Sequence, residues 1–328
     1  MRILVFNCHE AWVHQLRLLD AHLDIIVGLS GRHTPDWDEA MRPLPPHSRR
    51  VTLPEVFRAR ESYDCIITHN LTDLLDVKSF PAPRILVVHL TLEGMVAEQQ
   101  PSVASEDFRA AVHKYAELTR AHVIAVSPMK GRSWGFEQHV VPLAADPADY
   151  LPWRGDLARG LRVSNYIVRR PRTLMWEFHR QVFSGLPVTL VGHNPELPGA
   201  EPSRYWQHLK EILQSHRFFI HTAHPGLEDG YNMATLEAMA AGLPILGNRH
   251  PTSPVAHGVS GFLSDDPAEL RGFAELLLSD QVLARRMGQA AQAAVRQKFS
   301  PASFRSAMLE GIRRAQQRWF SFSSPRPR

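Results

Sequence analysis

The chain has 328 residues, of which 44% are hydrophobic and 21% are charged, and its formal net charge at pH 7 is +4. This length suggests two domains, and the apolar fraction is high enough to fill two cores, which excludes an intrinsically disordered chain. The mildly basic balance is compatible with a peripheral contact at an anionic membrane surface but does not require one.

Residues 1–7, MRILVFN, are typical of a strand rather than of a signal peptide, and no apolar run approaches the ~18 residues of a membrane span. We therefore expect a cytoplasmic protein, peripheral at most at the inner face of the membrane. The two cysteines, Cys8 and Cys65, lie in apolar strand-like runs without a zinc-site spacing. We expect them to be buried, reduced thiols.

The chain begins with a β-α-β pattern. Residues 2–8 and 23–30 are typical of buried strands, and residues 12–22 of the helix between them, so we expect a parallel sheet. No G-x-G-x-x-G follows the first strand, so no dinucleotide is expected. His9 and Glu10 occupy the loop after this strand, at the carboxyl edge where ligands of parallel sheets bind. Together with His14 they form an alternative metal-ligand set, but the spacing differs from the H-E-x-x-H zinc site and we predict no metal.

Residues 31–60 are polar and proline-rich, which predicts a long connection between elements. Within it, Asp36-Trp37-Asp38 matches the D-x-D metal motif, but no buried strand precedes it and we expect a solvated turn. Residues 64–70 and 84–91 are strong strand patterns that place His69 and His89 at the carboxyl edge of the sheet. For His69, a ligand contact and a packing role are both open.

Further helices and strands follow along the chain, with an interdomain link and a basic loop between them. Residues 105–121 predict a helix capped by Ser105, residues 122–127 a strand, and residues 148–160 an interdomain link. Residues 161–172 predict a strand that leads into a loop with three arginines, and residues 173–183 a helix. A strand over 186–192 follows, and the chain is helical after Asp266, with Pro301 as the first residue of the last helix.

The most informative stretch is residues 221–266. A strand over 217–223 leads through a turn-rich loop to a helix over 233–241 that ends at Gly242. Asp229 in the loop and Glu237 in the helix are eight residues apart, and Gly230 lets the backbone approach a ligand closely. The amino end of such a helix favours a phosphate, whereas carboxylates beside a phosphate favour sugar hydroxyls. The pattern therefore predicts a nucleotide-sugar site.

This stretch resembles the donor-binding segment of retaining GT-B glycosyltransferases, family 4 (glycosyl transferases group 1) in particular. The family pattern is E-x7-E followed by A-M-A-x-G-x-P, which Asp229-x7-Glu237 and the residues 238–244, AMAAGLP, match. Downstream, HGVSGFL at 257–263 and DDPAEL at 265–270 resemble further family segments. Asp229 stands where the pattern has Glu, so either Asp229 or its neighbour Glu228 is the candidate for the contact with the donor sugar.

The resemblance implies an α/β protein of GT-B fold, with two Rossmann-like domains whose parallel sheets face each other across a cleft. The implied acceptor-side domain spans residues 1–150, with a C-terminal helix at about 304–322 packing back on it. The donor domain spans 151–303, and residues 323–328 form a disordered tail. The implied activity is retaining transfer of a sugar from a nucleotide-diphosphate sugar, UDP-sugar before GDP-sugar, to an acceptor hydroxyl without a metal or other cofactor.

The resemblance also implies a role for individual positions. Arg170 stands at the position of a family lysine that touches the diphosphate, Asn165 at that of a family arginine, and His89 at that of a histidine facing the donor sugar. The implied catalytic residues are His89, Asp229, Arg170 and Arg169. The implied donor-binding residues are Asn165, Gly192, Glu228, Gly230, Tyr231, Asn232, Met233, Thr235 and Glu237, and the acceptor-side residues are His9, Glu10 and His69. For Arg172 a solvated role is equally open.

Three other functions stay open at this stage. A nucleotide-sugar epimerase shares the GT-B architecture, and a non-catalytic nucleotide-sugar-binding protein would tolerate the substitutions at 165 and 229. The DNA-glucosylating alternative is disfavoured because no basic stripe is interleaved with aromatic residues. The acceptor class, whether glycan, lipid-linked or small molecule, is not specified by the sequence, and polysaccharide or glycoconjugate biosynthesis is the expected setting.

Overall fold

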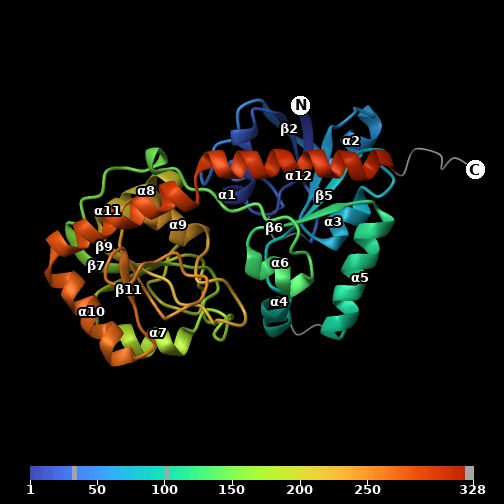
Figure 1. Ribbon diagram of the computed structural model, residues 1–328. Helices are drawn as coiled ribbons and strands as arrows, with labels where there is room; N and C mark the ends of the chain where they lie inside the picture. Colours follow the sequence, from blue (N-terminus) through green and yellow to red (C-terminus); the bar gives the residue numbers. More distant parts are fainter. Residues whose placement is uncertain (32–34, 100–102, 322–328) are drawn as a thin grey trace, which may run out of the picture. The chain divides into compact units, whose positions relative to one another are not determined.

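The computed structural model describes residues 1–31, 35–99 and 103–321, which divide into two compact units (Figure 1). Unit 1 comprises Met1–Leu92, Pro101–Leu143 and Ala302–Arg328, and unit 2 comprises Glu93–Gln100 and Ala144–Pro301. The tail expected at 323–328 lies outside the described residues. No helix within the described ranges is both long and apolar enough to cross a membrane.

Unit 1 is built on a six-stranded parallel sheet in the order β3-β2-β1-β4-β5-β6. The strands are β1 (Arg2–Phe6), β2 (His22–Val27), β3 (Ser48–Thr52), β4 (Cys65–Thr68), β5 (Arg84–Val88) and β6 (His122–Ala125). Every residue of β4 and β5 is buried, as expected for the interior strands of a sheet covered on both faces. The loops after β1, β4 and β5 therefore meet at one edge of the sheet.

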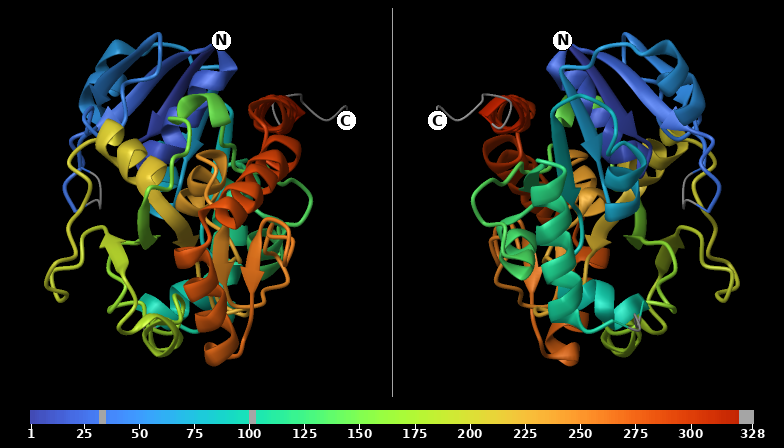
Figure 2. Two further views of the ribbon diagram at one scale, coloured as in Figure 1. Left: turned by 90° about the vertical axis from the view of Figure 1, so that its left-hand side faces the viewer. Right: turned by 90° about the vertical axis from the view of Figure 1, so that its right-hand side faces the viewer.

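Short helices connect these strands, and the last helix of the chain returns to them. The helices are α1 (Glu10–Val13), α2 (Leu53–Ala59), α3 (Leu71–Asp76), α5 (Ser105–Leu118), α6 (Pro128–Trp134) and α12 (Pro301–Ser321). Phe304 of α12 contacts Trp12 at 6.3 Å between ring centroids, and Gln316 donates to the backbone oxygen of Asp64 at 3.2 Å. Figures 1 and 2 show α12 running along this sheet. Pro301 begins the helix, as predicted.

Several local predictions for unit 1 were wrong. The connection expected over residues 31–60 contains β3 and α2, and α2 begins with a capping box between Thr52 and Glu55. The helix expected over 12–22 is only four residues of α-helix, followed by a 3-10 helix over His14–Leu19 that ends at Asp20 in the left-handed region. Ser105 does not cap α5, because Ala104 holds the N-cap position and Ser105 is the first helical residue.

The expected solvated turn around Asp36 is only partly solvated. Asp36 and Asp38 are exposed, but Trp37 is buried and its Nε1 donates to the backbone oxygen of Arg42 at 2.8 Å.

His14, considered as a metal ligand, is also buried, and its Nδ1 lies 3.0 Å from the backbone oxygen of Pro43. His14 therefore has a packing role.

Unit 2 is built on a five-stranded parallel sheet in the order β11-β10-β9-β7-β8. The strands are β7 (Leu157–Val163), β8 (Val188–Val191), β9 (His216–Ile220), β10 (Ile245–Gly247) and β11 (Gly261–Leu263). The helices are α4 (Leu92–Gln99), α7 (Trp176–Phe183), α8 (Trp206–Ser215), α9 (Met233–Ala240), α10 (Pro267–Ser279) and α11 (Gln281–Lys298), with a 3-10 turn at Pro147–Asp149. Its core joins Phe218 and Ile220 of β9 to Leu270 of α10 and Met287 of α11.

The helix at the centre of the sequence pattern forms where it was predicted. It spans Met233–Ala240, and Gly242 follows at φ 88°, in the left-handed region that favours glycine at a helix end. Helix α11 packs closely on this end, because a Cβ added at Gly288 would lie 1.9 Å from the backbone oxygen of Gly242. A side chain at position 288 would therefore separate the two elements.

Candidate functional site

The loops after β7, β8 and β9 carry the predicted donor-site residues that precede α9, and β7 lies between β8 and β9 in the sheet. Glu228 and Asp229, which follow β9, are both buried, and the backbone N–H of Asp229 donates to Oε1 of Glu228 at 2.9 Å. Glu237, in α9, is also buried. All three carboxylates therefore have little access to bulk water.

Arg170 lies beside Glu228. Its Nη2 lies 3.8 Å from Oε2 of Glu228, and its Nε donates to Oε1 of Glu98 at 2.6 Å. Arg169 points elsewhere: its Nε donates to Oε1 of Glu196 at 2.5 Å, and its guanidinium lies 5.3 Å from the Tyr166 ring centroid. The structure therefore places Arg170, and not Arg169, beside the buried acids.

The amino end of α9 is closed by its own side chains. Oδ1 of Asn232 accepts the backbone N–H of Thr235 at 2.9 Å, and Oγ1 of Thr235 accepts the backbone N–H of Asn232 at 3.3 Å. This reciprocal capping box gives two predicted donor-binding residues a local structural role. Tyr231, just before it, is buried against Phe299 with 5.1 Å between ring centroids, and burial raises the pKa of its hydroxyl.

His250 is a site residue that sequence reasoning missed. It follows β10 and lies against the loop of the acids, since a Cβ added at Gly230 would come within 2.8 Å of its ring. Burial lowers the pKa of His250, while the backbone oxygen of Glu228 and the charge of Asp229 act in the opposite direction. The available signal was its position after a buried strand, in the sequence Asn248-Arg249-His250.

Asn165 and Gly192 join the loops that follow β7 and β8. Oδ1 of Asn165 accepts the backbone N–H of His193 at 2.8 Å. Gly192 has φ 138°, and a Cβ there would lie 2.2 Å from the backbone oxygen of Ser164, so only glycine permits this approach. Both predicted residues thus shape the loop edge of the unit.

A buried arginine that the sequence did not single out supports the same edge. Arg162 of β7 donates to Oγ1 of Thr222 at 2.8 Å and to the backbone oxygen of Leu174 at 2.9 Å. Burial lowers its pKa to about 9. Arg162 therefore ties the loop that carries Arg170 to the segment that leads from β9 to Asp229.

In unit 1, the predicted residues at the carboxyl edge also meet. Nδ1 of His69 and Nε2 of His89 lie 2.9 Å apart and share a hydrogen bond, and the buried Trp12 contacts both rings edge-on. Burial lowers the pKa of both histidines, that of His69 to about 3, so the pair is neutral at pH 7. Glu10 lies in the first turn of α1, and His9 holds its N-cap position and is exposed.

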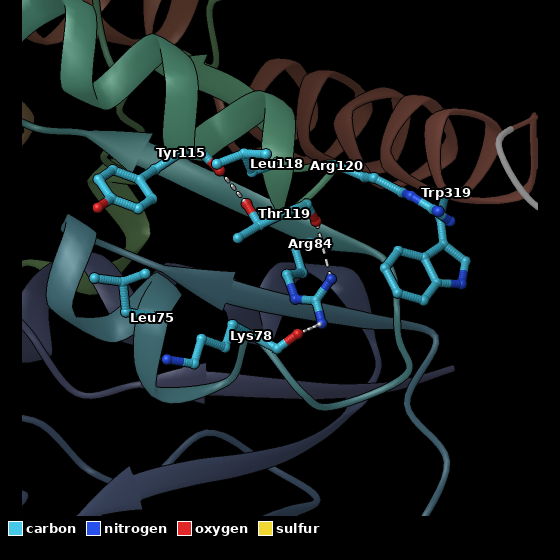
Figure 3. Close-up of a pocket in the computed structure, with 8 residues that line it drawn as sticks. All are labelled: Leu75, Lys78, Arg84, Tyr115, Leu118, Thr119, Arg120 and Trp319. Carbon is cyan, nitrogen blue, oxygen red and sulfur yellow. Dashed lines mark hydrogen bonds between the residues drawn. The ribbon is translucent and has the colours of Figure 1, made fainter.

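Unit 1 also contains a pocket of about 590 Å³ at the opposite end of β5 from His89. Leu75, Lys78, Arg84, Tyr115, Leu118, Thr119, Arg120 and Trp319 line it (Figure 3). Arg84 is buried, and its guanidinium donates to the backbone oxygens of Thr119 at 2.9 Å and Lys78 at 3.0 Å. The Trp319 ring centroid lies 4.7 Å from the same guanidinium. Arg84 thus joins α3, α5 and α12.

Residues 188–280 match the family model described as Glycosyl transferases group 1. No curated protein sequence matches the chain. Among solved structures, HepE from Anabaena in complex with UDP and glucose superposes with a TM-score of 0.67 at 15% identity, over 95% of this chain and 99% of that one. A sucrose-phosphate synthase from Thermosynechococcus elongatus gives 0.66 at 16% identity, over 99% of this chain and 100% of that one.

A third structure is that of a TarM mutant from S. aureus in complex with fondaparinux, alpha-GlcNAc-glycerol and UDP. It gives a TM-score of 0.61 at 13% identity, and this chain spans only 58% of its length. At such identities the likeness shows the fold. The comparisons confirm the GT-B fold and, over residues 188–280, the resemblance to glycosyl transferases group 1, and they support the prediction of a glycosyltransferase.

Proposed function

We propose that this protein is a glycosyltransferase that moves a sugar from a nucleotide-diphosphate sugar, with UDP as the first choice of nucleotide, to an acceptor hydroxyl. The observation that carries the proposal is the position of Arg170, 3.8 Å from the carboxylate of Glu228 in the loop before α9. HepE and TarM were solved with UDP, which supports the choice of nucleotide. The family match over residues 188–280 includes this helix.

The chemistry follows from where charge develops. Breaking the bond between the anomeric carbon and the diphosphate leaves negative charge on the phosphate oxygens, which a guanidinium stabilises by bidentate hydrogen bonds. We assign this role to Arg170, with α9 contributing the positive end of its dipole. The carboxylates of Asp229 and Glu228 are assigned to hydroxyl groups of the donor sugar, and that of Glu237 to the ribose.

Transfer is proposed to retain the anomeric configuration and to need no metal. The leaving phosphate oxygen would take the acceptor's proton on the same face of the sugar, and His89 would orient the donor sugar. A neutral His89 suits this role, because a neutral imidazole both accepts and donates hydrogen bonds. A lipid-linked acceptor would bring the protein to the inner face of the membrane, which the net charge of +4 favours.

Donor binding is tested by thermal denaturation with UDP, GDP, ADP and their sugars. A ligand at 100 times its Kd stabilises the folded protein by about 2.7 kcal/mol, so the preferred nucleotide gives the largest rise in melting temperature at equal concentration. If none of these ligands raises the melting temperature, the proposed donor class is wrong.

The two alternative functions are separated from transfer by incubating the protein with donor alone. An epimerase needs no acceptor and would convert the donor sugar into its epimer, whereas a glycosyltransferase without acceptor releases only free sugar and nucleoside diphosphate slowly. Donor that remains unchanged over days would favour a non-catalytic nucleotide-sugar-binding protein.

A further inference from the structure

A cysteine and two histidines meet at the carboxyl edge of the unit 1 sheet. Cys8, His69 and His89 follow β1, β4 and β5, which are adjacent in the sheet order. One sulfur and two ring nitrogens, one atom from each residue, all lie within 4.8 Å of one another. The three side chains come from separate parts of the sequence, so no spacing motif reveals the group.

The two imidazoles are held in place before any ion arrives. Trp12, which is 1% exposed, lies edge-on to the His69 ring at 5.1 Å and to the His89 ring at 5.2 Å. The backbone N–H of His69 donates to Oδ2 of Asp73 at 3.1 Å, which fixes the start of the loop. Fixed rings lose little freedom when they bind a ligand, so the group is preorganised.

The charges around the group favour a cation at the sulfur. Cys8 is half-buried, not buried as the sequence predicted. Burial raises the pKa of its thiol and the negative charges of Asp73 and Glu10 raise it further, so the sulfur keeps its proton until a cation replaces it. His9 and Lys130 oppose them at the neighbouring ring, where they help to lower the pKa of His89. Neutral imidazoles are the form that coordinates metals, and the two half-buried histidines are neutral at pH 7.

We propose that Cys8, His69 and His89 form a binding site for one borderline transition-metal ion, Zn²⁺ in the first instance, with water as the fourth ligand. One thiolate and two imidazoles form a ligand set that zinc accepts, at about 2.3 Å for sulfur and 2.0–2.1 Å for nitrogen. In a tetrahedral site the two nitrogens lie roughly 3.3 Å apart, so the 2.9 Å pair opens by about 0.4 Å.

Binding changes the protonation of the group in a defined way. The thiol of Cys8 loses its proton to solvent and becomes a thiolate. The hydrogen bond between the two rings breaks, and the ring that donated in it carries its proton on the other nitrogen instead. One proton is released for each ion bound, so the affinity rises with pH.

The metal site is separate from the proposed sugar transfer, and metal binding is expected to inhibit that transfer. Because His89 is also assigned to the donor sugar, a bound ion would withdraw this ring and inhibit transfer. Direct ion binding does not depend on that assignment, so the two proposals fail independently.

Co²⁺ is the probe for the first test, because cobalt bound to a thiolate gives a near-ultraviolet charge-transfer band together with visible bands. We expect the full chain to bind one Co²⁺ with a charge-transfer band, and Zn²⁺ to abolish the spectrum. Cys8→Ser should remove the charge-transfer band, and His69→Ala should weaken ion binding at least tenfold. Cys65→Ser is the matched control, since Cys65 is a buried cysteine of β4 outside the group, and it should keep the band.

A second test uses the unmodified protein and does not depend on how the variants fold. Zn²⁺ should slow alkylation of Cys8 at least tenfold, as measured by mass spectrometry of the modified peptide. A protein that shows no thiolate band with Co²⁺, keeps the band in Cys8→Ser, or is alkylated at Cys8 at the same rate with Zn²⁺ would overturn the proposal.

Discussion

Nε of Arg170 donates to Oε1 of Glu98 at 2.6 Å, so the cation that lies beside the buried Glu228 is already paired. The two side chains are 28% and 17% exposed. A diphosphate must compete with Glu98 for this guanidinium. The pair therefore holds the arginine at the site and also lowers its affinity for an anion.

Replacing Arg170 with alanine should slow sugar transfer at least a hundredfold. Removing one preorganised donor to a developing negative charge typically costs ~3 kcal/mol of barrier. The measurement is kcat with the preferred donor. Arg172→Ala is the control, because Arg172 is an exposed arginine of the same loop, and it should change kcat little. Near-normal turnover by Arg170→Ala would remove Arg170 from the mechanism.

Replacing Glu98 with glutamine should strengthen binding of the nucleoside diphosphate. The substitution keeps the shape of the side chain and removes the charge that competes for Arg170. A partly exposed ion pair is worth up to about 1 kcal/mol, so we expect Kd for UDP to fall by up to about fivefold. Isothermal calorimetry measures the change. In the background of Arg170→Ala the effect should vanish, and an equal gain there would contradict competition for that guanidinium.

Replacing Gly288 with alanine should destabilise unit 2 by roughly 1–3 kcal/mol, as expected for overpacking. The new Cβ would lie 1.9 Å from the backbone oxygen of Gly242, and backbone on both sides limits how far they can separate. Gly272→Ala in α10 is the control, because a Cβ there meets no atom within 4 Å. A helix-interior alanine should stabilise that helix by up to about 1 kcal/mol. Urea denaturation measures the free energy of unfolding of both variants. Equal changes in the two variants would show that an added Cβ at 288 is not crowded.

Asp24 should make the stability of unit 1 depend on pH. It is buried, and Arg2, Arg49 and Tyr63 all donate to its carboxylate. Burial opposes its ionisation, but the hydrogen bonds from Arg49 and Tyr63 and the charge of Arg2 outweigh burial and lower its pKa below the ordinary 3.8. The unfolded chain has the ordinary pKa of 3.8, and the folded protein has a lower one. The ionised Asp24 therefore contributes its full stabilisation above pH 3.8, and this contribution is lost as the pH falls through the folded-state pKa.

The matching variant is Asp24→Asn, which should lower the free energy of unfolding by about 2–3 kcal/mol at pH 7. The loss should shrink at acid pH, where the native carboxyl group is protonated as well. Glu61→Gln is the control: Glu61 pairs with the same Arg49 at 2.8 Å but is 29% exposed, so less than about 1 kcal/mol is expected. A deficit in Asp24→Asn that is independent of pH would argue for lost packing instead.

The strands that are buried on both faces were predictable because their sequences are continuously apolar. β5 is one example, and all five of its residues are buried. β3 was missed because it is an edge strand whose sequence, SRRVT, is largely polar and follows a proline-rich stretch. Helix α2 carried a readable signal, the T-x-x-E capping box at Thr52 and Glu55, directly after that strand.

The candidate site was predictable where a motif or a strand end marked it. His69 and His89 were placed at one edge by the ends of their strands, and the structure brings them into contact. The capping of α9 by Asn232 and Thr235 could also be predicted from the sequence, since both side chains suit the first turn of a helix. The pairing of Arg170 with Glu98 was not predictable, because 72 residues separate them and only the folded unit brings them together.

The buried guanidinium of Arg162 couples two segments that would otherwise respond separately to substitution. It bonds to the backbone of Leu174, beyond the arginine loop, and to Thr222, seven positions before Asp229. Loss of this one side chain would release both segments together. An alanine scan scored by activity would therefore rank Arg162 with the essential residues, although its role is structural and requires no contact with the donor.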